Sequence, residues 1–546
     1  FARTGTKDSR ITFTRASKAT YVAADGLIKT TPVNLILGSQ NFTDGFINGV
    51  SNVTQNTTTS PIGDQTGSTL TSTTEVNALR QTFDCQSGVT YTVSIHVKQD
   101  TANTFTWKFF GTAAGISKAV TVDFTNGTVS NGSIQSLSNG WYRVSVTATA
   151  TGDATPSVIL GIGSGTTHIW GLQVEESSTA TDYIATTSTI SGASRFDHDS
   201  ATGESLGLLI EEARTNDISS GFSTGSSVSG TALSVDTSII NPDGTTGAIK
   251  ATATADLSNH DVRVSSDGET VNHCFSLFVK KGNHRYVGVS QGGSANNVHC
   301  LFDFDTKTIF DDGGKGTFSF VSSGFEEYAN GWFRLHVVGT TSGTLFRAFL
   351  AEDDQQDGLR NWTASGSEFM YVWGPQKEEG SFLTSYIPTS GSAVTRAADV
   401  AEITGTNFSA FYNQSEGMFF GDFTGPEGFV FAAHDGSNDN RHGFSNVSGR
   451  PFTQISGAIT NFGVSPTSIV GGGKFAHGYK ANDYGAFGDG VNLPATSPTT
   501  VPTGVSELAL GYRGSYLADL FLNGHIKRLS YFPTRLPDAT LQSITS

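Results

Sequence analysis

Apolar and polar residues alternate along several short segments of the chain. The segment 91–98 shows the pattern well, in the order Tyr91, Thr92, Val93, Ser94, Ile95, His96, Val97 and Lys98. Residues two apart share one face of a β-strand, so this alternation predicts a strand that buries one face. Turn signals separate such runs at short intervals, at 126–127, 139–140, 311–313 and 330–331. This pattern is typical of antiparallel β-sandwiches.

The order of these segments repeats along the chain. Five matches recur in the same order, pairing 91–98 with 274–280, 123–124 with 303–304, 139–144 with 330–335, 169–176 with 372–379, and 183–184 with 386–387. A repeat of this length indicates a duplicated domain. We therefore expect two tandem jelly-roll-like β-sandwiches, module one at 33–191 and module two at 213–398.

Two strand-like segments, 11–30 and 195–216, flank module one and lie outside the repeat. We expect them to pair with each other in a small β collar, formed by residues 1–32 and 192–212, into which module one is inserted. Backbone pairing between residues 10–30 and 195–212 would confirm this collar.

A third domain is expected at 399–546, where tryptophan disappears and phenylalanine-glycine pairs become frequent. Near its end, residues 521–532 are expected to form a hairpin around an Asn523-Gly524 turn. Residues 537–544 predict a short helix with Pro537 in its first turn. The fold class predicted for the whole chain is all-β.

Composition supports this fold class and excludes several partners. The chain has 546 residues, enough for three or four domains, with 64 glycines, 2 methionines and only 15% charged residues. The net charge of −16 would repel nucleic acid and anionic membranes, so neither is an expected partner. Cys85, Cys274 and Cys300 are too scattered for a disulfide framework, although a Cys274–Cys300 bridge remains open.

Three segments resemble a known group of proteins. Residues 11–17, 195–216 and 384–399 look like bacteriophage head spike fibres and tail-fibre-like virion proteins, and 510–513, 523–529 and 536–539 look like a laminin-G or concanavalin-like sandwich. The resemblance implies a location on the virion surface, carbohydrate-binding folds, other virion proteins as partners and a homo-oligomer, often a trimer. It carries over no binding residues, and it leaves head or tail attachment open.

Candidate catalytic motifs do not form a convincing site. Ser290 lies in a Gly-x-Ser-x-Gly run, but a strand is expected after it, whereas a nucleophile elbow needs a helix. The repeated pairs Glu175-Glu176 and Glu378-Glu379 place adjacent carboxylates on opposite strand faces, which indicates a structural role. No alternating carboxylate run of the glucanase type occurs. We therefore predict that the chain is not an enzyme.

Calcium is the one cofactor that the sequence makes a candidate. Asp435, Asn438 and Asp439 place oxygen ligands in one short loop, which suits a hard cation. A solvated Asx-rich turn explains the same residues. No other cofactor is expected.

Module two carries additional residues that module one lacks. Trp332 lies 191 positions after Trp141, whereas Trp373 lies 203 positions after Trp170, so twelve residues are added between the paired tryptophans. The added stretch contains an acidic cluster, and it is expected to be a loop.

Two tryptophans without a counterpart in the repeat are candidates for glycan contact. Aromatic faces stack on sugar rings, and carboxylates accept hydrogen bonds from hydroxyl groups. The candidate residues are Trp362, Asp353, Asp354, Asp357 and Trp107. An ordinary packed aromatic side chain is the alternative at either tryptophan.

Together these observations predict a non-enzymatic appendage of a bacteriophage virion that binds carbohydrate of the host surface or the environment. The expected partner is cell-surface polysaccharide, bound through several weak sites on an oligomer. The first alternative is a purely structural capsid decoration protein without glycan binding. A polysaccharide depolymerase is the last.

Overall fold

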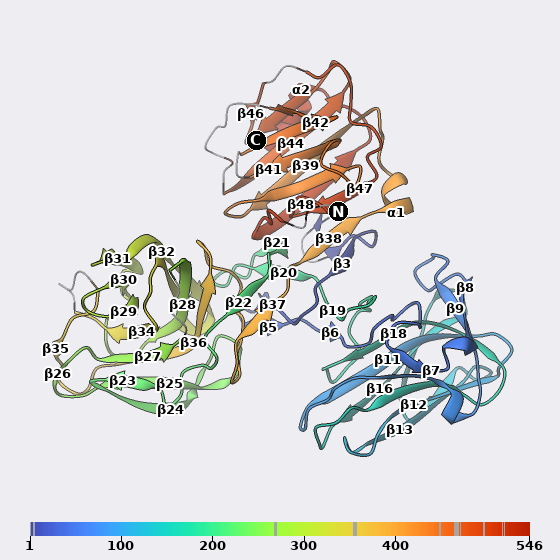
Figure 1. Ribbon diagram of the computed structural model, residues 1–546, viewed down its shortest axis with the longest axis horizontal. Helices are drawn as coiled ribbons and strands as arrows, with labels where there is room; N and C mark the ends of the chain where they lie inside the picture. Colours follow the sequence, from blue (N-terminus) through green and yellow to red (C-terminus); the bar gives the residue numbers. More distant parts are fainter. Residues whose placement is uncertain are drawn as a thin grey trace. The chain divides into compact units, whose positions relative to one another are not determined.

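The computed structural model describes residues 2–3, 6–266, 270–352, 358–446, 449–462, 469, 471–494, 497–515, 517 and 519–546. The predicted all-β class is confirmed, since almost every element is a strand of an antiparallel sheet (Figure 1). The chain divides into two compact units, one comprising 14–18 and 31–193 and the other comprising 1–13, 19–30 and 194–546. Each is described by itself.

Module one fills the smaller unit with two packed sheets. In spatial order the first contains β14 (Thr128–Ser130), β13 (Ile116–Asp123), β12 (Thr104–Gly111), β17 (Ser157–Ile162), β10 (Leu79–Thr82) and β7 (Phe46–Asn48). The second contains β15 (Ser133–Ser136), β16 (Trp141–Thr149), β11 (Thr90–Gln99), β18 (Thr166–Glu175), β9 (Gly67–Thr71) and β8 (Val53–Thr58). Their inward faces form one hydrophobic core.

Module two repeats this arrangement. Its first sheet contains β31 (Thr308–Lys315), β30 (Asn297–Asp303), β29 (Tyr286–Gly292), β34 (Leu345–Leu350), β27 (Asp261–Ser265) and β23 (Ser227–Ser229). Its second contains β32 (Ser319–Tyr328), β33 (Trp332–Thr340), β28 (Asn272–Lys281), β36 (Phe369–Glu379), β25 (Thr246–Ala253) and β24 (Thr231–Ile240). Taken in chain order, the strands of the two modules occupy the same positions, so the sequence repeat is a repeat of topology.

The repeated Asn-Gly-Trp motif forms the same turn in both modules. Asn139 and Asn330 have φ of 58° and 60°, in the left-handed region that asparagine tolerates well. The following Trp141 and Trp332 begin β16 and β33 with their side chains fully buried. The motif is therefore a structural signal of the fold.

The repeated Trp-Gly motif marks a β-bulge. Gly171 and Gly374 have φ of 60° and 55°, and the register of β18 and β36 shifts beside them. A Cβ on Gly374 would lie 3.1 Å from Phe278 and 3.2 Å from Tyr386. Glycine is required here both by conformation and by space.

A buried glutamate closes each module in the same way. Glu175 accepts hydrogen bonds from the amide and hydroxyl of Thr181, at 3.0 and 2.6 Å, and Glu378 does the same with Thr384, at 2.9 and 2.5 Å. Both glutamates are fully buried. Their repetition therefore has a structural reason.

The C-terminal sandwich contains two further sheets, drawn mainly in orange and red in Figure 1. One contains β2 (Thr6–Lys7), β1 (Ala2–Arg3), β48 (Gly524–Phe532), β39 (Glu416–Thr424), β44 (Gly472–Lys480), β45 (Gly485–Gly488) and β46 (Val491–Asn492), with β21 (Ser205–Ile210) pairing β48 and β20 (Arg195–His198) pairing β21. The other contains β3 (Thr12–Thr14), β38 (Val400–Ile403), β47 (Glu507–Leu510), β40 (Phe429–His434), β41 (Arg441–Ser445), β42 (Arg450–Ile455) and β43 (Ala458–Asn461).

The prediction that residues 1–32 and 192–212 form a separate β collar is wrong. Residues 10–30 and 195–212, all of them described, form no backbone pairing with each other: β4 (Thr20–Val22) pairs with β5 (Ile28–Thr30), and β21 pairs with β48. The reason is hydrophobic burial, because Phe13 and Ile210 belong to the core of the C-terminal sandwich. β3, β20 and β21 therefore join the sheets of the C-terminal sandwich, while the β4–β5 hairpin packs through Val22 and Ile28 against module two.

The end of the chain corrects one expectation and agrees with another. Residues 524–532 form the single strand β48 instead of a hairpin, and Asn523, at φ 51°, lies just before it. The helix expected at 537–544 is present as α2 (Asp538–Thr545), directly after Pro537. In the part of the chain that the structure describes, no helix is long and apolar enough to cross a membrane.

Candidate functional site

A small polar cleft lies on the outward face of the second sheet of module two. Its volume is about 200 Å³, and the chain lines it from five regions: β4 with β5, the β20–β21 hairpin, module two, the end of β39, and the start of β48. All five regions belong to the larger unit. The site therefore combines segments that lie far apart in the sequence.

One row of cross-strand neighbours crosses the sheet face beneath this cleft. The row runs over β36, β28, β33 and β32, and its residues are Trp373, Phe278, Arg334 and Glu326. Arg334 and Glu326 line the cleft. Directly opposite residues on one sheet face are close enough to act together.

Arg334 is the central donor of the cleft. Its side chain is 2% exposed, and its guanidinium donates to the Thr384 carbonyl at 2.8 Å and to the Ser276 hydroxyl at 3.1 Å. Among the described residues, no carboxylate oxygen lies within 4 Å of it, and Glu326 and Glu378 attract it only from farther away. Buried charges are normally paired, which makes Arg334 a candidate ligand contact.

Tyrosines and a carboxylate surround this arginine. Tyr328 donates from its hydroxyl to Glu326 at 3.2 Å, and Tyr386 packs against Trp373 with ring centroids 4.9 Å apart. Tyr328 is buried, whereas Glu326 is exposed. The cleft thus places a solvent-accessible acceptor beside tyrosine rings that are themselves mostly buried.

An Asp–His pair forms the opposite wall. The Nε2 of His525 lies 2.9 Å from Oδ2 of Asp197, and the backbone amide of Val22 donates to Oδ1 of Asp197 at 2.5 Å. Both paired side chains are mostly buried, with 18% and 14% exposed. This pair joins β20 to β48 and orients polar atoms toward the cleft.

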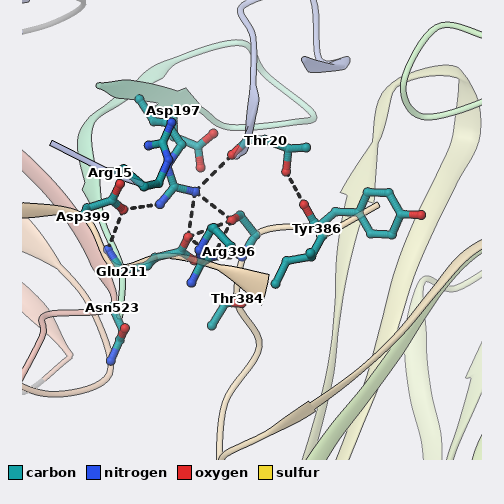
Figure 2. Close-up of polar contacts among 12 residues, drawn as sticks. Arg15, Thr20, Asp197, Glu211, Thr384, Tyr386, Arg396, Asp399 and Asn523 are labelled. Carbon is teal, nitrogen blue, oxygen red and sulfur yellow. Dashed lines mark hydrogen bonds and ion pairs between the residues drawn. The ribbon is translucent and has the colours of Figure 1, made fainter. Parts of the chain in front are cut away.

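A buried ion-pair network holds these walls together (Figure 2). Glu211 forms ion pairs with Arg195, at 2.7 Å, and with Arg396, while Asp399 forms a second ion pair with Arg195. Burial alone would raise the pKa of Glu211, but the attraction of Arg396 and Arg195 holds it well below its usual range. The network is charged at neutral pH and fully enclosed.

The network also binds the neighbouring segments. Glu211 accepts from the amide and hydroxyl of Ser385 at 2.8 and 2.7 Å, and the Asn523 side chain accepts from the Glu212 amide at 2.8 Å. Thr20 donates to the carbonyl of Tyr386 on the same side. These contacts fix the loop that carries Thr384 and Tyr386 against the C-terminal sandwich.

Both candidate tryptophans lie in hydrophobic cores. Trp107 is fully buried between the sheets of module one, and Trp362 is 9% exposed, with its indole donating to the Leu350 carbonyl at 3.2 Å and packing edge-on against His260. Neither presents a ring face to solvent, so the packed-aromatic alternative describes both. Asp353, Asp354 and Asp357 lie outside the described residues.

The connection that carries the inserted residues of module two is described from residue 358 onward and at residues 351–352. Eighteen residues separate β34 from β36, where three separate β17 from β18 in module one. A Cβ on Gly358, at the end of this connection, would lie 2.6 Å from the Asn297 side chain. The described end of the insertion therefore packs closely on β30, on the first sheet of module two and not on the cleft.

The predicted calcium loop is occupied by its own hydrogen bonds. Asp435 accepts from the Ser437 amide and hydroxyl at 2.9 and 2.6 Å and from the Asn440 side chain at 3.0 Å. Asn438 and Asp439 follow in the same loop, an Asx-type turn. Within the described residues, no three His, Cys, Asp or Glu side chains gather as a metal site. Calcium at Asp435, Asn438 and Asp439 stays a prediction.

Ser290 and the cysteines take structural positions. Ser290 lies inside β29, fully buried, and β29 is followed by the antiparallel strand β30, as expected for a residue that is not in a nucleophile elbow. Cys85, Cys274 and Cys300 are buried free thiols, so the bridge left open by the sequence is not formed.

One repeated residue in the sequence, an arginine, could have indicated the cleft. Arg143 and Arg334 follow the repeated Asn-Gly-Trp motif at the same spacing. A repeated arginine on an outward strand face indicates either a buried ion pair or a binding contact. Only the fold reveals that no described carboxylate lies within 4 Å of either arginine.

Comparisons with known proteins give similarities of fold. No protein-family model matches the chain, and no curated protein matches it. The chain is similar to the tandem CBM22 domains of Paenibacillus barcinonensis Xyn10C (12% identity, 64% of this chain, 98% of that chain, TM-score 0.22). It is also similar to domains LG4–5 of the mouse laminin α1 chain (10% identity, 59% of this chain, 89% of that chain, TM-score 0.18).

A third similarity corrects one prediction. The chain is similar over its full length to a Trypanosoma rangeli sialidase in complex with 2,3-difluorosialic acid (10% identity, 100% of this chain, 99% of that chain, TM-score 0.22). This similar structure is an enzyme, so it contradicts the prediction that the chain is not an enzyme. These similarities concern the β-sandwich fold and assign no reaction to the chain.

Proposed function

We propose that the chain is a glycan-binding protein whose cleft, centred on Arg334, holds a sugar residue. The observation that carries the proposal is a buried guanidinium with no carboxylate oxygen within 4 Å among the described residues, at the base of a small cleft. Arginine donates to sugar hydroxyls, and Glu326 and Asp197 accept from them. Tyr21, the half-buried tyrosine of the lining, supplies apolar surface of the kind that sugar faces need.

The volume of the cleft limits the size of the ligand that it can hold. A volume of about 200 Å³ lies below the roughly 300–1,000 Å³ of pockets for drug-sized ligands. The cleft suits one sugar residue, with the rest of the glycan outside. Recognition of a terminal or branching residue follows from this size.

The proposed location is the surface of a bacteriophage particle, as a head or tail appendage. The resemblance of segments 11–17, 195–216 and 384–399 to virion proteins supports this. All four charged residues of the network come from two of those segments: Arg195 and Glu211 from 195–216, and Arg396 and Asp399 from 384–399. Display of several chains on one particle would raise a weak affinity for cell-surface polysaccharide.

A glycan array with the full chain, followed by calorimetry on the best ligand, tests the proposal. Arg334→Gln should weaken binding by about 10- to 100-fold, the usual effect of losing hydrogen bonds to a charged group. Arg528→Gln, at an exposed arginine of β48, is the matched control and should bind like wild type.

Two outcomes would contradict the proposal. Equal binding by wild type and a folded Arg334→Gln variant would place the site elsewhere. Absence of glycan binding, combined with stable binding to purified capsids, would favour the structural decoration protein.

A further inference from the structure

Module one repeats the cross-strand row of module two that contains the cleft residues Arg334 and Glu326. Its row crosses β18, β11, β16 and β15, and the residues are Trp170, His96, Arg143 and Gln135. The corresponding row of module two, in the same strand order, is Trp373, Phe278, Arg334 and Glu326. The tryptophan and the arginine are kept, while the residues beside them differ.

The kept arginine has the same support in both modules. Arg143 donates from Nη2 to the Ser94 hydroxyl at 3.0 Å, just as Arg334 donates to Ser276 at 3.1 Å. No carboxylate oxygen lies within 4 Å of the Arg143 guanidinium among the described residues. Arg143 is half-buried, so it is more accessible than Arg334.

The surroundings of Arg143 are polar and open. Gln135 and Asp182 are exposed, and they occupy the positions that Glu326 and Ser385 take in module two. Tyr183 packs against Trp170 with ring centroids 4.5 Å apart, as Tyr386 does against Trp373. An amide, a carboxylate and a guanidinium therefore surround one accessible patch beside an aromatic pair.

A groove begins beside this patch. Its volume is about 540 Å³, and it is lined by β13, the β14–β15 connection and β16. Ser133 and Ser145, which border it, lie two positions along the same strands from Gln135 and Arg143 and therefore share their face. Lys118 and Asn131 add polar groups farther along.

We infer that module one carries a second glycan site, centred on Arg143 and continued by this groove, that binds a neutral oligosaccharide. The inference rests on the proposed function, because it assigns the same ligand chemistry to the equivalent residues. The groove is more than twice the volume of the cleft and lined largely by hydroxyl and amide groups, so it accommodates several linked sugar residues. The cleft of module two holds one.

Calorimetry on the full chain tests this, with neutral hexose oligosaccharides from mono- to hexasaccharide as the probes. We expect two sites for each wild-type chain, and affinity at the module-one site should rise with oligosaccharide length. Arg143→Gln should remove that length-dependent site and leave the other, whereas Arg334→Gln should do the reverse. The double variant should bind nothing.

A second variant separates binding from folding. Gln135 is exposed on the short edge strand β15, so Gln135→Ala should leave thermal unfolding unchanged while weakening the length-dependent site about 10-fold. Equal binding by wild type, Gln135→Ala and a folded Arg143→Gln would overturn the inference.

The two proposals fail in different ways. Loss of all binding in Arg334→Gln alone, with a single wild-type site, contradicts the second site only. A single site that Arg143→Gln abolishes and Arg334→Gln leaves intact contradicts the proposed cleft and supports module one.

Discussion

The imidazole of His442 stacks on the ring of Tyr479, with centroids 4.1 Å apart and planes 27° from parallel. Both side chains are fully buried in the C-terminal sandwich. His442 is linked to a second buried histidine, His477, through the hydroxyl of Thr453, at 3.0 and 3.1 Å. Two histidines therefore lie in a core that has no carboxylate hydrogen-bonded to either of them among the described residues.

This arrangement predicts that the C-terminal sandwich is destabilised by mild acid. Burial lowers the pKa of His442 well below its usual value and that of His477 to about 3, with nearby Arg535 acting in the same direction on His477. Below about pH 6.5 the unfolded chain binds more protons than the folded one, so stability falls as the pH falls. Between pH 7 and pH 5 the loss should be about 2 kcal/mol for each histidine.

Hydrogen exchange of peptides from 416–534 at the two pH values measures this loss locally. His477→Gln should reduce the pH dependence by about half, because glutamine does not titrate while His442 remains. Protection factors, corrected for the intrinsic exchange rate at each pH, that are the same at pH 5 and pH 7 in wild type would contradict the prediction.

The network around Glu211 predicts a separate transition at lower pH. Its folded pKa lies below the unfolded value of about 4.3, so its stabilisation is complete above that value and is lost as the pH falls further. Arg396→Gln leaves a buried carboxylate short of one partner and should cost about 3–5 kcal/mol. Urea unfolding measures this, and Lys480→Gln, which removes a surface ion pair with Glu416, should cost under about 1 kcal/mol.

Trp362 is expected to affect stability and not glycan contact directly. Its burial predicts a loss of about 3–5 kcal/mol for Trp362→Ala, and a smaller one for Trp362→Phe. Glycan-array binding of the folded Trp362→Phe protein should equal that of wild type. Selective loss of binding in that variant, without a change in unfolding, would restore Trp362 as a ligand contact.

Gly374 should control the aromatic wall of the cleft. Gly374→Ala forces a side chain into a left-handed conformation against Phe278 and Tyr386, at a cost of about 1–3 kcal/mol. Both the thermal midpoint and the affinity of the cleft should fall. Gly221→Ala is the control, because a Cβ there meets nothing within 4 Å; a Gly374→Ala protein that behaves like it would contradict the prediction.

Local pattern alone determined the strands and the repeat. Alternation in 91–98 predicted β11 and the residues that face the core, because successive side chains of a strand point to opposite faces. The prediction that only one face is buried was wrong, since Thr92, Ser94 and His96 on the other face are buried as well. The motifs Asn139-Gly140 and Trp170-Gly171 repeat because the backbone needs left-handed conformations at these turns and bulges. These are short-range requirements, so the sequence displays them directly.

Only the tertiary structure decided where the flanking segments pair and where a site forms. Phe13 and Ile210 are apolar strand residues in any fold, and nothing local indicates that their partner core begins near residue 400. Trp362 is a residue type that often contacts sugars, but it is buried in the core of module two. The cleft at Arg334 is lined by residues that lie far from it in the sequence, such as Thr20 and His525. Burial and charge pairing depend on contacts between residues far apart in the sequence. The sequence of one segment therefore does not predict them.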